Sequence, residues 1–388
     1  MRFRLLDGGL QFCTKHHNML NCIDLFAGAG GFSLAATQAG FNVRLAVEND
    51  KHAAETYRRN LCDASSLFPV MLDADITSLS PEEELRGRFE IGEECDLLLG
   101  GPPCQGFSAH RINNAGINDP RNKLIHTYFD FARTFRPKAF LMENVPGMLW
   151  PRHRDYLNRF IEEGREAHYK IFEPVVLDAR NYGVLQRRKR VFVLGLREDI
   201  NADDFVWPPE PTHGSETACR ENSNLRPWSS CRSVFAPAPQ GDPNDVHMNH
   251  TRDLVEVFNN TPLNGGSRRD SGRVLACHKD HDGHKDVYGR IDPSGPAPTM
   301  TTACINPSKG RFVHPTEPHG ITARQAARIQ TFPDTFVFEG GLMAAGRQIG
   351  NAVPVEFGRV LIEHIKPLLQ SGNTLTKPAE LEKGLEPV

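Results

Sequence analysis

One cysteine stands where a nucleophile could be presented. Cys104 lies in the segment GGPPCQGFS, residues 100–108, directly after the apolar residues 96–99. Two prolines stiffen this turn and the glycines open it, so we expect the thiol at a cleft rather than in a core. A lone cysteine is more often a small buried side chain, so Cys104 needs chemical partners before it can be interpreted as catalytic.

Two charged segments could supply such partners. Glu143 ends a second apolar segment, where a carboxyl group could act as a general acid, although an ion-paired carboxylate is the simpler interpretation. Residues 186–190 read QRRKR, and a charge run of this kind is most often a solvated face. In a strand, however, alternation places Gln186, Arg188 and Arg190 on one side, and two arginines would then enter one cleft.

A glycine-rich turn offers a separate site for a nucleoside. Residues 24–32 read DLFAGAGGF, the pattern of a strand, a tight turn and the start of a helix, and Glu48 ends the next expected strand. Glycine lets the backbone approach a ligand closely, and an acid at that position can accept both hydroxyls of a ribose. A nicotinamide dinucleotide is one candidate, although Ser33 occupies the third fingerprint position. Asp75 could accept from an adenine amino group, but taken alone it is more simply a solvated loop acid.

The elements that must position these residues alternate along the chain. Strand patterns occupy residues 22–27, 43–48, 96–99, 139–143 and 190–196, and helical patterns occupy residues 32–39, 52–60 and 123–135. The alternation predicts an α/β fold with a doubly wound, mostly parallel sheet covered on both faces. Ligands of such sheets bind beyond the carboxyl ends of the strands, which is where the candidate residues fall.

The alternation stops after residue 200. Residues 201–344 are rich in proline, glycine and asparagine, and we expect them to form a smaller, loop-rich domain. Residues 18–200 and 345–370 would then form the catalytic and cofactor-binding domain, with Asn351 capping the last helix and Pro354 in its first turn. Residues 371–388 are expected to be a flexible tail.

Composition excludes several classes of protein. The 388 residues are 39% hydrophobic and 24% charged with a net charge of -3, as in ordinary domains that fold in water. With no apolar run near the roughly 18 residues that span a bilayer and no leader pattern, we expect a cytosolic protein without a membrane partner. Nine cysteines without repeated pairs favour free thiols. The cluster at residues 277–284 lacks a second pair of zinc ligands, so no metal is expected.

In their order, the motifs resemble those of the DNA cytosine-5 methyltransferases. The resemblance covers residues 24–354, and Pro-Pro-Cys-Gln followed by Glu-Asn-Val is highly specific for this family. It implies the fold of the S-adenosylmethionine-dependent methyltransferases with a target-recognition domain. The segments that carry it are residues 24–32, Asp75, residues 102–105, 143–145, 186–190, 328–334 and 350–354.

The resemblance also implies a cofactor, S-adenosylmethionine, and the residues that hold it. Phe26 would lie against the adenine, Glu48 on the ribose and Asp75 near the adenine amino group. Asn49 departs from the family, in which an aromatic side chain often packs on the adenine. The other implied cofactor residues are Ala27, Gly28, Gly30, Gly31, Asn49, Ile76, Pro103, Leu124, Asn351 and Ala352.

The reaction implied by the resemblance is methylation of carbon 5 of a cytosine flipped out of duplex DNA. Cys104 would add to carbon 6 while Glu143 protonates or hydrogen-bonds ring nitrogen 3. Arg190 would hold the exocyclic oxygen, and Arg188 the phosphate backbone or the cysteine loop. Expected DNA-contacting residues are Gln105, Ser108, Gln186, Arg268, Arg269, Thr299 and Thr301.

Alternative functions remain at this point. A nicotinamide-dependent dehydrogenase would leave Cys104 and Glu143 unexplained, and a DNA-binding regulator would not need the intact Arg190. A tRNA cytosine-5 methyltransferase would share the chemistry, but the long region between Arg190 and Arg328 favours DNA. The resemblance further associates the chain with bacterial restriction-modification or phage defence, a cognate restriction endonuclease or other defence components, and a monomeric state.

Overall fold

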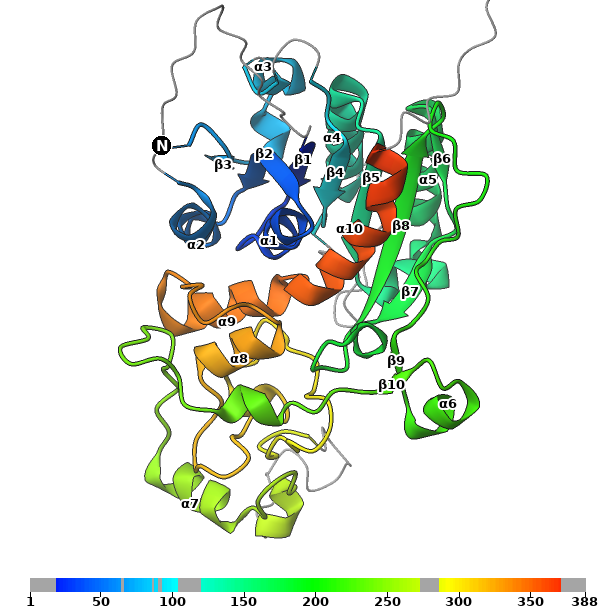
Figure 1. Ribbon diagram of the computed structural model, residues 1–388. Coiled ribbons are helices and arrows are strands. Elements are labelled where there is room, and N and C mark those ends of the chain that lie inside the picture. The colour runs from blue at the N-terminus through cyan, green and yellow to red at the C-terminus, as the bar shows by residue number, and fades with distance from the viewer. Residues whose placement is uncertain are drawn as a thin grey trace, which may run out of the picture.

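A central sheet organises the upper half of the molecule in Figure 1. The computed structural model describes residues 19–63, 66–85, 87–89, 93–103, 120–272 and 286–370, so the expected tail lies outside the described residues. The strands are β1 Leu20–Leu25, β2 Phe41–Glu48, β3 Val70–Asp73, β4 Leu97–Gly100, β5 Ala139–Asn144, β6 Tyr169–Ile171, β7 Val175–Asp178 and β8 Lys189–Arg197.

The strand order confirms the predicted mostly parallel sheet. The order is β3-β2-β1-β4-β5-β8-β6, with β7 also paired to β8. The pairs from β3 to β5 are parallel, whereas β8 runs antiparallel to β5, β6 and β7. Apolar runs such as the wholly buried Leu97–Gly100 form the middle strands because both of their faces are covered.

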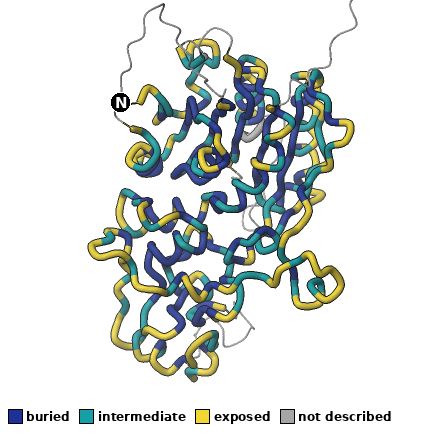
Figure 2. Tube along the Cα trace, viewed as in Figure 1, coloured by how far each residue is buried: buried dark blue, intermediate teal, exposed yellow. Residues whose placement is uncertain are grey.

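Helices cover both faces of the sheet, as Figures 1 and 2 show. On one face, α1 and α10 pack with Leu97, Leu99 and Phe192 in one apolar cluster. On the other, α4 and α5 bring Phe129 and Phe160 together with their ring centroids 4.8 Å apart. The helices are α1 Gly31–Gln38, α2 Lys51–Leu61, α3 Pro81–Leu85, α4 Pro120–Phe135, α5 Arg154–Glu166, α6 Glu216–Glu221, α7 Arg252–Asn260, α8 Ala323–Ile329, α9 Gly341–Asn351 and α10 Val355–Gln370.

The last two helices correct one expectation. Asn351 is the final residue of α9 and does not cap α10, which begins at Val355 after Pro354. The chain turns between the two helices, and α10 then returns to the sheet beside α1 (Figure 1). Within the described residues, none of the helices is both long and apolar enough to cross a membrane.

The region after β8 is largely irregular, as predicted, and buried arginines hold its main chain. Besides α6 to α9, it has two short paired strands, β9 His213–Gly214 and β10 Arg226–Pro227. Arg290 is 1% exposed and donates to main-chain carbonyls at Phe258, Thr261, His314 and Glu317. Loops leave many carbonyls without strand or helix partners, and a guanidinium can satisfy several at once.

This region shares an apolar core with the sheet. One cluster of buried side chains contains Leu99 and Phe192 from the strands together with Met300 and Phe312 from the irregular region and Ile349 from α9. Backbone also meets backbone at the junction, because a Cβ built on Gly350 would lie 2.2 Å from the Thr301 carbonyl carbon and oxygen. The end of α9 therefore packs directly on residues 301–302.

Gly350→Ala should destabilise the protein despite the better helix propensity of alanine. The new Cβ would overlap the Thr301 carbonyl, and overpacking of this kind costs about 1–3 kcal/mol. Urea denaturation should show the loss. Gly295→Ala is the matched control, because a Cβ there meets nothing within 4 Å. Equal stability of the two variants would contradict the backbone contact.

Candidate active site

The glycine-rich turn lies at the carboxyl end of β1 and leads into α1. Phe26, Gly28 and Gly30 have φ angles of 60°, 56° and 95°. A Cβ on Gly28 would meet nothing within 4 Å, whereas one on Gly31 would lie 2.6 Å from the Val353 carbonyl oxygen. Gly28 therefore faces open space that a ligand can approach, while Gly31 permits close packing of α1 against residues 352–353.

Glu48, at the end of β2, lies beside this turn. Its carboxylate accepts from the backbone N–H groups of Gly28 at 2.8 Å, Asn49 at 2.9 Å and Asp50 at 2.8 Å. Burial raises the pKa of Glu48, and these three donors oppose the rise. A carboxylate has about four acceptor positions, so at least one remains for a ligand hydroxyl.

The other predicted cofactor residues come from several elements, including the ends of strands, α4 and the end of α9. Asp75 accepts from Thr77 N at 2.9 Å and caps the short turn Ile76–Ser78; this bond holds the pKa of Asp75 below its usual value. Ile76 is buried in the cluster against which Phe26 and Leu124 pack. The remaining positions are buried at Ala27, Gly30 and Gly31, half-buried at Ala352, and exposed at Asn49, Pro103 and Asn351.

A buried polar chain beneath the turn was missed by the sequence reasoning. Ser33 Oγ donates to Asp24 Oδ2 at 2.6 Å, and the Tyr57 hydroxyl donates to Ser33 Oγ at 2.9 Å. Burial raises the pKa of Asp24 to about 7. Asp24 and Ser33 stand nine residues apart within the glycine motif, but nothing in the sequence links either of them to Tyr57.

The predicted general acid pairs with a predicted arginine. Arg190 Nε lies 2.6 Å from Glu143 Oε1 in an ion pair between two largely buried side chains. The antiparallel register of β5 and β8 produces this approach, because Asn144 faces Val191 and Glu143 faces Phe192. Arg190, one of the two arginines that the strand pattern placed on one side, thus lies beside Glu143.

The turn before Cys104 is fixed beside this ion pair. Asn144 Nδ2 donates to the Pro102 carbonyl at 3.1 Å, and a Cβ on Gly101 would lie 3.5 Å from Glu143 Oε2. Asn144, a positioning residue that we had not predicted, thereby anchors the proline turn to the end of β5. Cys104, Gln105 and Ser108 themselves lie outside the described residues.

Three predicted DNA or catalytic contacts are placed differently. Arg188 and Gln186 are 0% exposed, and Arg268 is 4% exposed. Arg188 donates to the carbonyls of Met300, Gly350 and Ala352. The cysteine loop that it was expected to hold lies outside the described residues. Gln186 donates to Gln330 Oε1. For Gln186 and Arg188, which precede β8, a strand pattern says which side a residue faces but not what covers that side.

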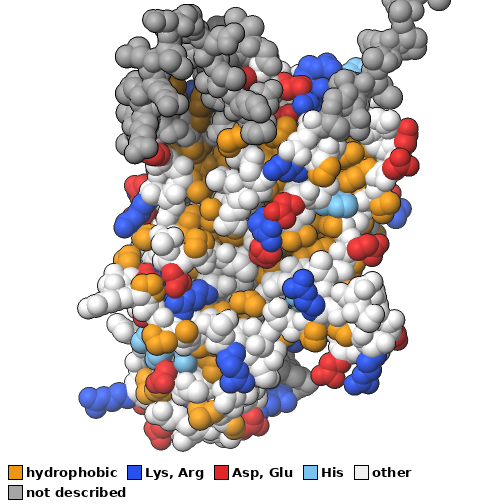
Figure 3. Space-filling model, viewed as in Figure 1, with side chains coloured by type: hydrophobic (Ala, Val, Ile, Leu, Met, Phe, Trp, Pro, Cys, Tyr) orange, Lys and Arg blue, Asp and Glu red, His pale blue; other side chains and the backbone are white. Residues whose placement is uncertain are grey.

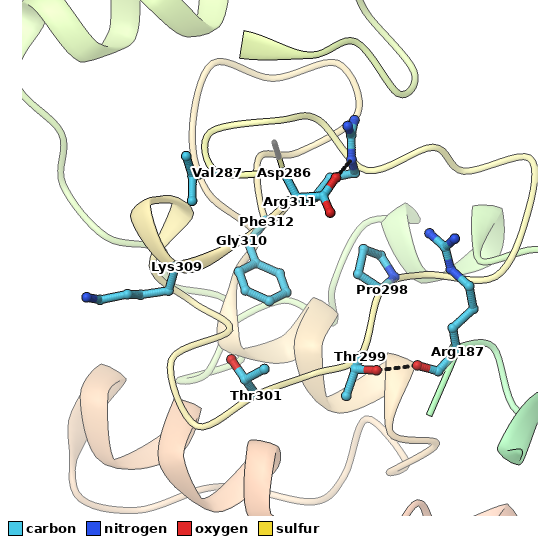
Figure 4. Close-up of a pocket in the computed structure, with 10 residues that line it drawn as sticks. All are labelled: Arg187, Asp286, Val287, Pro298, Thr299, Thr301, Lys309, Gly310, Arg311 and Phe312. Carbon is cyan, nitrogen blue, oxygen red and sulfur yellow. Dashed lines mark hydrogen bonds and ion pairs between the residues drawn. The ribbon is translucent and has the colours of Figure 1, made fainter. Parts of the chain in front are cut away.

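The predicted residues Thr299 and Thr301 line a pocket of about 280 Å³ (Figure 4). Thr299 Oγ1 donates to the Arg187 carbonyl, and the exposed Arg187 side chain lines the same pocket. Figure 4 shows the Phe312 ring between Pro298, Thr301 and Val287, with the Asp286–Arg311 ion pair, 3.0 Å long, nearby. Arg269, also predicted, is exposed near the start of a short turn, Arg268–Ser271.

Charge is mixed on the surface, and the Cys- and His-containing segment in which no metal was expected is not described. The face in Figure 3 carries interspersed basic and acidic side chains, as the small net charge suggests. Residues 277–284 lie outside the described residues. Within the parts of the chain that the structure describes, no group of three or more His, Cys, Asp or Glu side chains is arranged to hold a metal.

Solved structures with this fold are methyltransferases. A protein of an Escherichia coli prophage, described as a DNA modification methyltransferase, has a TM-score of 0.66 and 24% identity, covering 91% of this chain and 100% of its own. The Dnmt2 methyltransferase of S. pombe has a TM-score of 0.55 and 18% identity over 90% of this chain and 99% of its own. The chain therefore has the methyltransferase fold, and this fold implies the use of S-adenosylmethionine.

The family model for C-5 cytosine-specific DNA methylases matches residues 20–367, and the chain belongs to that family. A relative from Desulfomicrobium norvegicum, the Type II methyltransferase M.DdeI, is 32% identical over 92% of this chain and 91% of its own. M.FnuDI of Fusobacterium nucleatum is also 32% identical, over 92% and 97%. The protein is a DNA (cytosine-5) methyltransferase acting on double-stranded DNA, and the dehydrogenase, regulator and tRNA alternatives are disfavoured.

The raised pKa of Asp24 should make stability fall with rising pH. The folded carboxyl holds its proton up to about pH 7, whereas an ordinary aspartate loses it near 3.8. The unfolded chain therefore binds fewer protons in this window, and the free energy of unfolding falls as pH rises from about 4 to 7. The fall in the free energy of unfolding that Asp24 causes is on the order of 4 kcal/mol, and it should be absent in Asp24→Asn.

Urea denaturation at pH 5 and pH 8 measures this difference. The stability of Asp24→Asn relative to wild type should increase from the lower to the higher pH. Ser33→Ala is the control, because it removes the hydrogen bond to Asp24 but leaves the titrating carboxyl in place. Parallel pH curves for Asp24→Asn and wild type would show that Asp24 does not titrate in this range.

Proposed function

We propose that the enzyme methylates a cytosine within one DNA sequence by covalent catalysis at Cys104, assisted by Glu143 and Arg190. The observation that carries the proposal is the Glu143–Arg190 ion pair beside the turn that Asn144 anchors at Pro102, two residues before Cys104. A nucleophile, a proton donor and a fixed cation are the groups that activation of the cytosine ring requires.

Carbon 5 of cytosine is too weak a nucleophile to attack a methyl sulfonium directly. Addition of the Cys104 thiolate to carbon 6 moves an electron pair toward carbon 5. Glu143, in its protonated form, donates a proton or hydrogen bond at ring nitrogen 3, and Arg190 holds the exocyclic oxygen, so both stabilise the charge that develops. After methylation, removal of the carbon 5 proton by a base and elimination of Cys104 restore the aromatic ring.

S-adenosylmethionine would be held at the sheet edge next to this site, and when bound it supplies an electrophilic methyl group. The residues present fit it: Gly28 faces open space, and Glu48 retains acceptor capacity for a ribose hydroxyl. Asp75 would accept from the adenine amino group, and Phe26 with Leu124 would supply apolar surface. The other residues assigned to the cofactor site are Ala27, Gly30, Gly31, Asn49, Ile76, Pro103, Asn351 and Ala352.

DNA recognition is assigned to the irregular region, residues 201–344. Thr299, Thr301 and Arg187 line one pocket, and Arg269 is exposed, so these side chains can meet a base edge or a phosphate. Gln105 and Ser108 follow the nucleophile in sequence. They are assigned to DNA contacts from the family resemblance, as Cys104 is assigned to the nucleophile. The target base must be flipped into the site, because stacked bases do not expose carbons 5 and 6.

Its cellular role would be that of a modification enzyme in bacterial restriction or phage defence. The Type II methyltransferases among its relatives support this assignment. We further propose that it acts as a monomer in the cytoplasm, and that a cognate restriction endonuclease or other defence components recognise the same DNA sequence.

Covalent trapping tests the nucleophile. Bisulfite sequencing of DNA from cells that express the gene first identifies the methylated site. A duplex with 5-fluorocytosine at that site should form an adduct that survives denaturing electrophoresis, because fluorine cannot leave as a proton does. The adduct should require S-adenosylmethionine and be lost in Cys104→Ala. Glu143→Gln should slow its formation by roughly 10²–10⁴-fold.

Cys219→Ala is the matched control, since Cys219 is a half-buried thiol in α6, and it should form the adduct normally. An adduct in Cys104→Ala, or none in wild type at a site it demonstrably methylates, would reassign the nucleophile.

Glu48→Gln should weaken cofactor binding. The amide retains one oxygen acceptor but turns an NH₂ group toward the backbone donors that the carboxylate now accepts from. Loss of charge-assisted hydrogen bonds to the Glu48 carboxylate, worth about 1.5–3 kcal/mol, should raise the Kd of S-adenosylmethionine roughly 10–100-fold. Isothermal titration with S-adenosylmethionine measures the change. Asp73→Asn, at the end of the neighbouring strand, should bind normally, and an unchanged Kd in Glu48→Gln would remove Glu48 from the site.

A further inference from the structure

Arg188 is a fully buried cation whose hydrogen bonds go to main-chain carbonyls. Nη1 donates to Met300 O at 2.8 Å, and Nη2 donates to Gly350 O at 3.0 Å and to Ala352 O at 2.9 Å. Burial lowers the pKa of Arg188 well below its usual range. Burying a charge costs several kcal/mol, so this guanidinium must be compensated by well-formed bonds to all three acceptors.

Its acceptors belong to two different functional segments. Met300 lies between Thr299 and Thr301, which line the pocket of the recognition region. Gly350 and Ala352 lie at the end of α9, on either side of the predicted cofactor residue Asn351. One rigid guanidinium therefore fixes the recognition segment and the cofactor segment relative to each other.

Two buried glutamines complete this junction. Gln186 Oε1 accepts from Met300 N at 3.0 Å, and Gln186 Nε2 donates to Gln330 Oε1. Gln330 Nε2 donates in turn to the carbonyls of Ile349 and Ala352. Each side chain shares an acceptor or a partner with the next, so displacement of one segment disturbs the bonds to the others.

The junction is connected to the glycine turn by packing and to the Glu143–Arg190 ion pair through the chain. Residues 352–353 pack on Gly31 at the start of α1, where the glycine turn ends. A Cβ on Gly31 would lie only 2.6 Å from the Val353 carbonyl oxygen. Two residues beyond Arg188 in the chain, Arg190 forms the ion pair with Glu143. Arg188 thus joins the recognition segment to the cofactor segment, and residues 352–353 and Arg190 connect this junction to the glycine turn and to the ion pair.

We infer that Arg188 is a positioning residue that couples DNA at residues 299–301 to the cofactor site and to Arg190. This inference rests on the proposed function, which places DNA and cofactor on either side of the junction. It assigns Arg188 a role through other groups, not a contact with the substrate.

Coupling between two ligands is measured by the factor by which one changes the affinity of the other. The Kd of S-adenosylhomocysteine, which cannot be turned over, is determined by isothermal titration without and with a duplex that contains the methylated site. In wild type, DNA should tighten this binding by at least about fivefold. In Arg188→Lys the factor should fall to near one, because a point charge cannot serve three separated carbonyls.

Arg290→Lys is the matched control. Arg290 is also buried, and its side chain donates to main-chain carbonyls within the irregular region, at Phe258, Thr261, His314 and Glu317, instead of to residues 299–302 or α9. It should lose thermal stability as Arg188→Lys does and yet retain the wild-type factor. A role for Arg188 in stability alone would give the two variants the same behaviour.

Gln330→Met tests the same junction if Arg188→Lys does not fold. It removes the donors to Ile349 and Ala352 while keeping Arg188, so the factor should be intermediate. A factor near one in wild type, or an unchanged factor in whichever of the two variants folds, would overturn the inference. The proposed function fails separately, if wild type leaves no 5-methylcytosine or if Cys104→Ala still forms the adduct.

Discussion

The antiparallel pairing of β8 with β5 is the constraint on which the site depends. A parallel β8 would carry its amino-terminal arginines to the opposite end of the sheet, away from the carboxyl ends of β1, β2 and β5. Because β8 runs the other way, its first residues reach that edge, and Arg190 meets Glu143. The reversed strand thus adds cations to an edge that otherwise presents the carboxylates Glu48, Asp75 and Glu143.

The sequence predicted the sheet and its reactive edge because both depend on local patterns. Buried strands such as Leu97–Gly100 are continuous apolar runs, and the glycine turn is confined to a few adjacent residues. The family resemblance then assigned Glu143 and Arg190 from motifs alone. The short strands β3, β6 and β7 were not predicted, since three or four residues give too little periodicity to identify a strand. The 13-residue helix α5 was also not predicted.

What the sequence could not predict are contacts between distant segments. Arg188 and Arg190 have the same residue type and the same strand phase, yet one is buried under residues 300 and 350–352 while the other is paired with Glu143. Only the packing of the irregular region on the sheet separates their roles. Tyr57 is similar, because its bond to Ser33 arises from the placement of α2 beside the turn.

Buried arginines in the irregular region have a consequence for the evolution of sequence specificity. Its main chain is held by side chains such as Arg290, and by the Arg324–Asp242 pair, with 0% and 3% of the two side chains exposed. The exposed side chains between these anchors contribute little to the fold. If residues 201–344 read the DNA sequence, as proposed above, substitutions there change the recognised sequence while the loops keep their course, so new specificities can arise without passing through unstable intermediates.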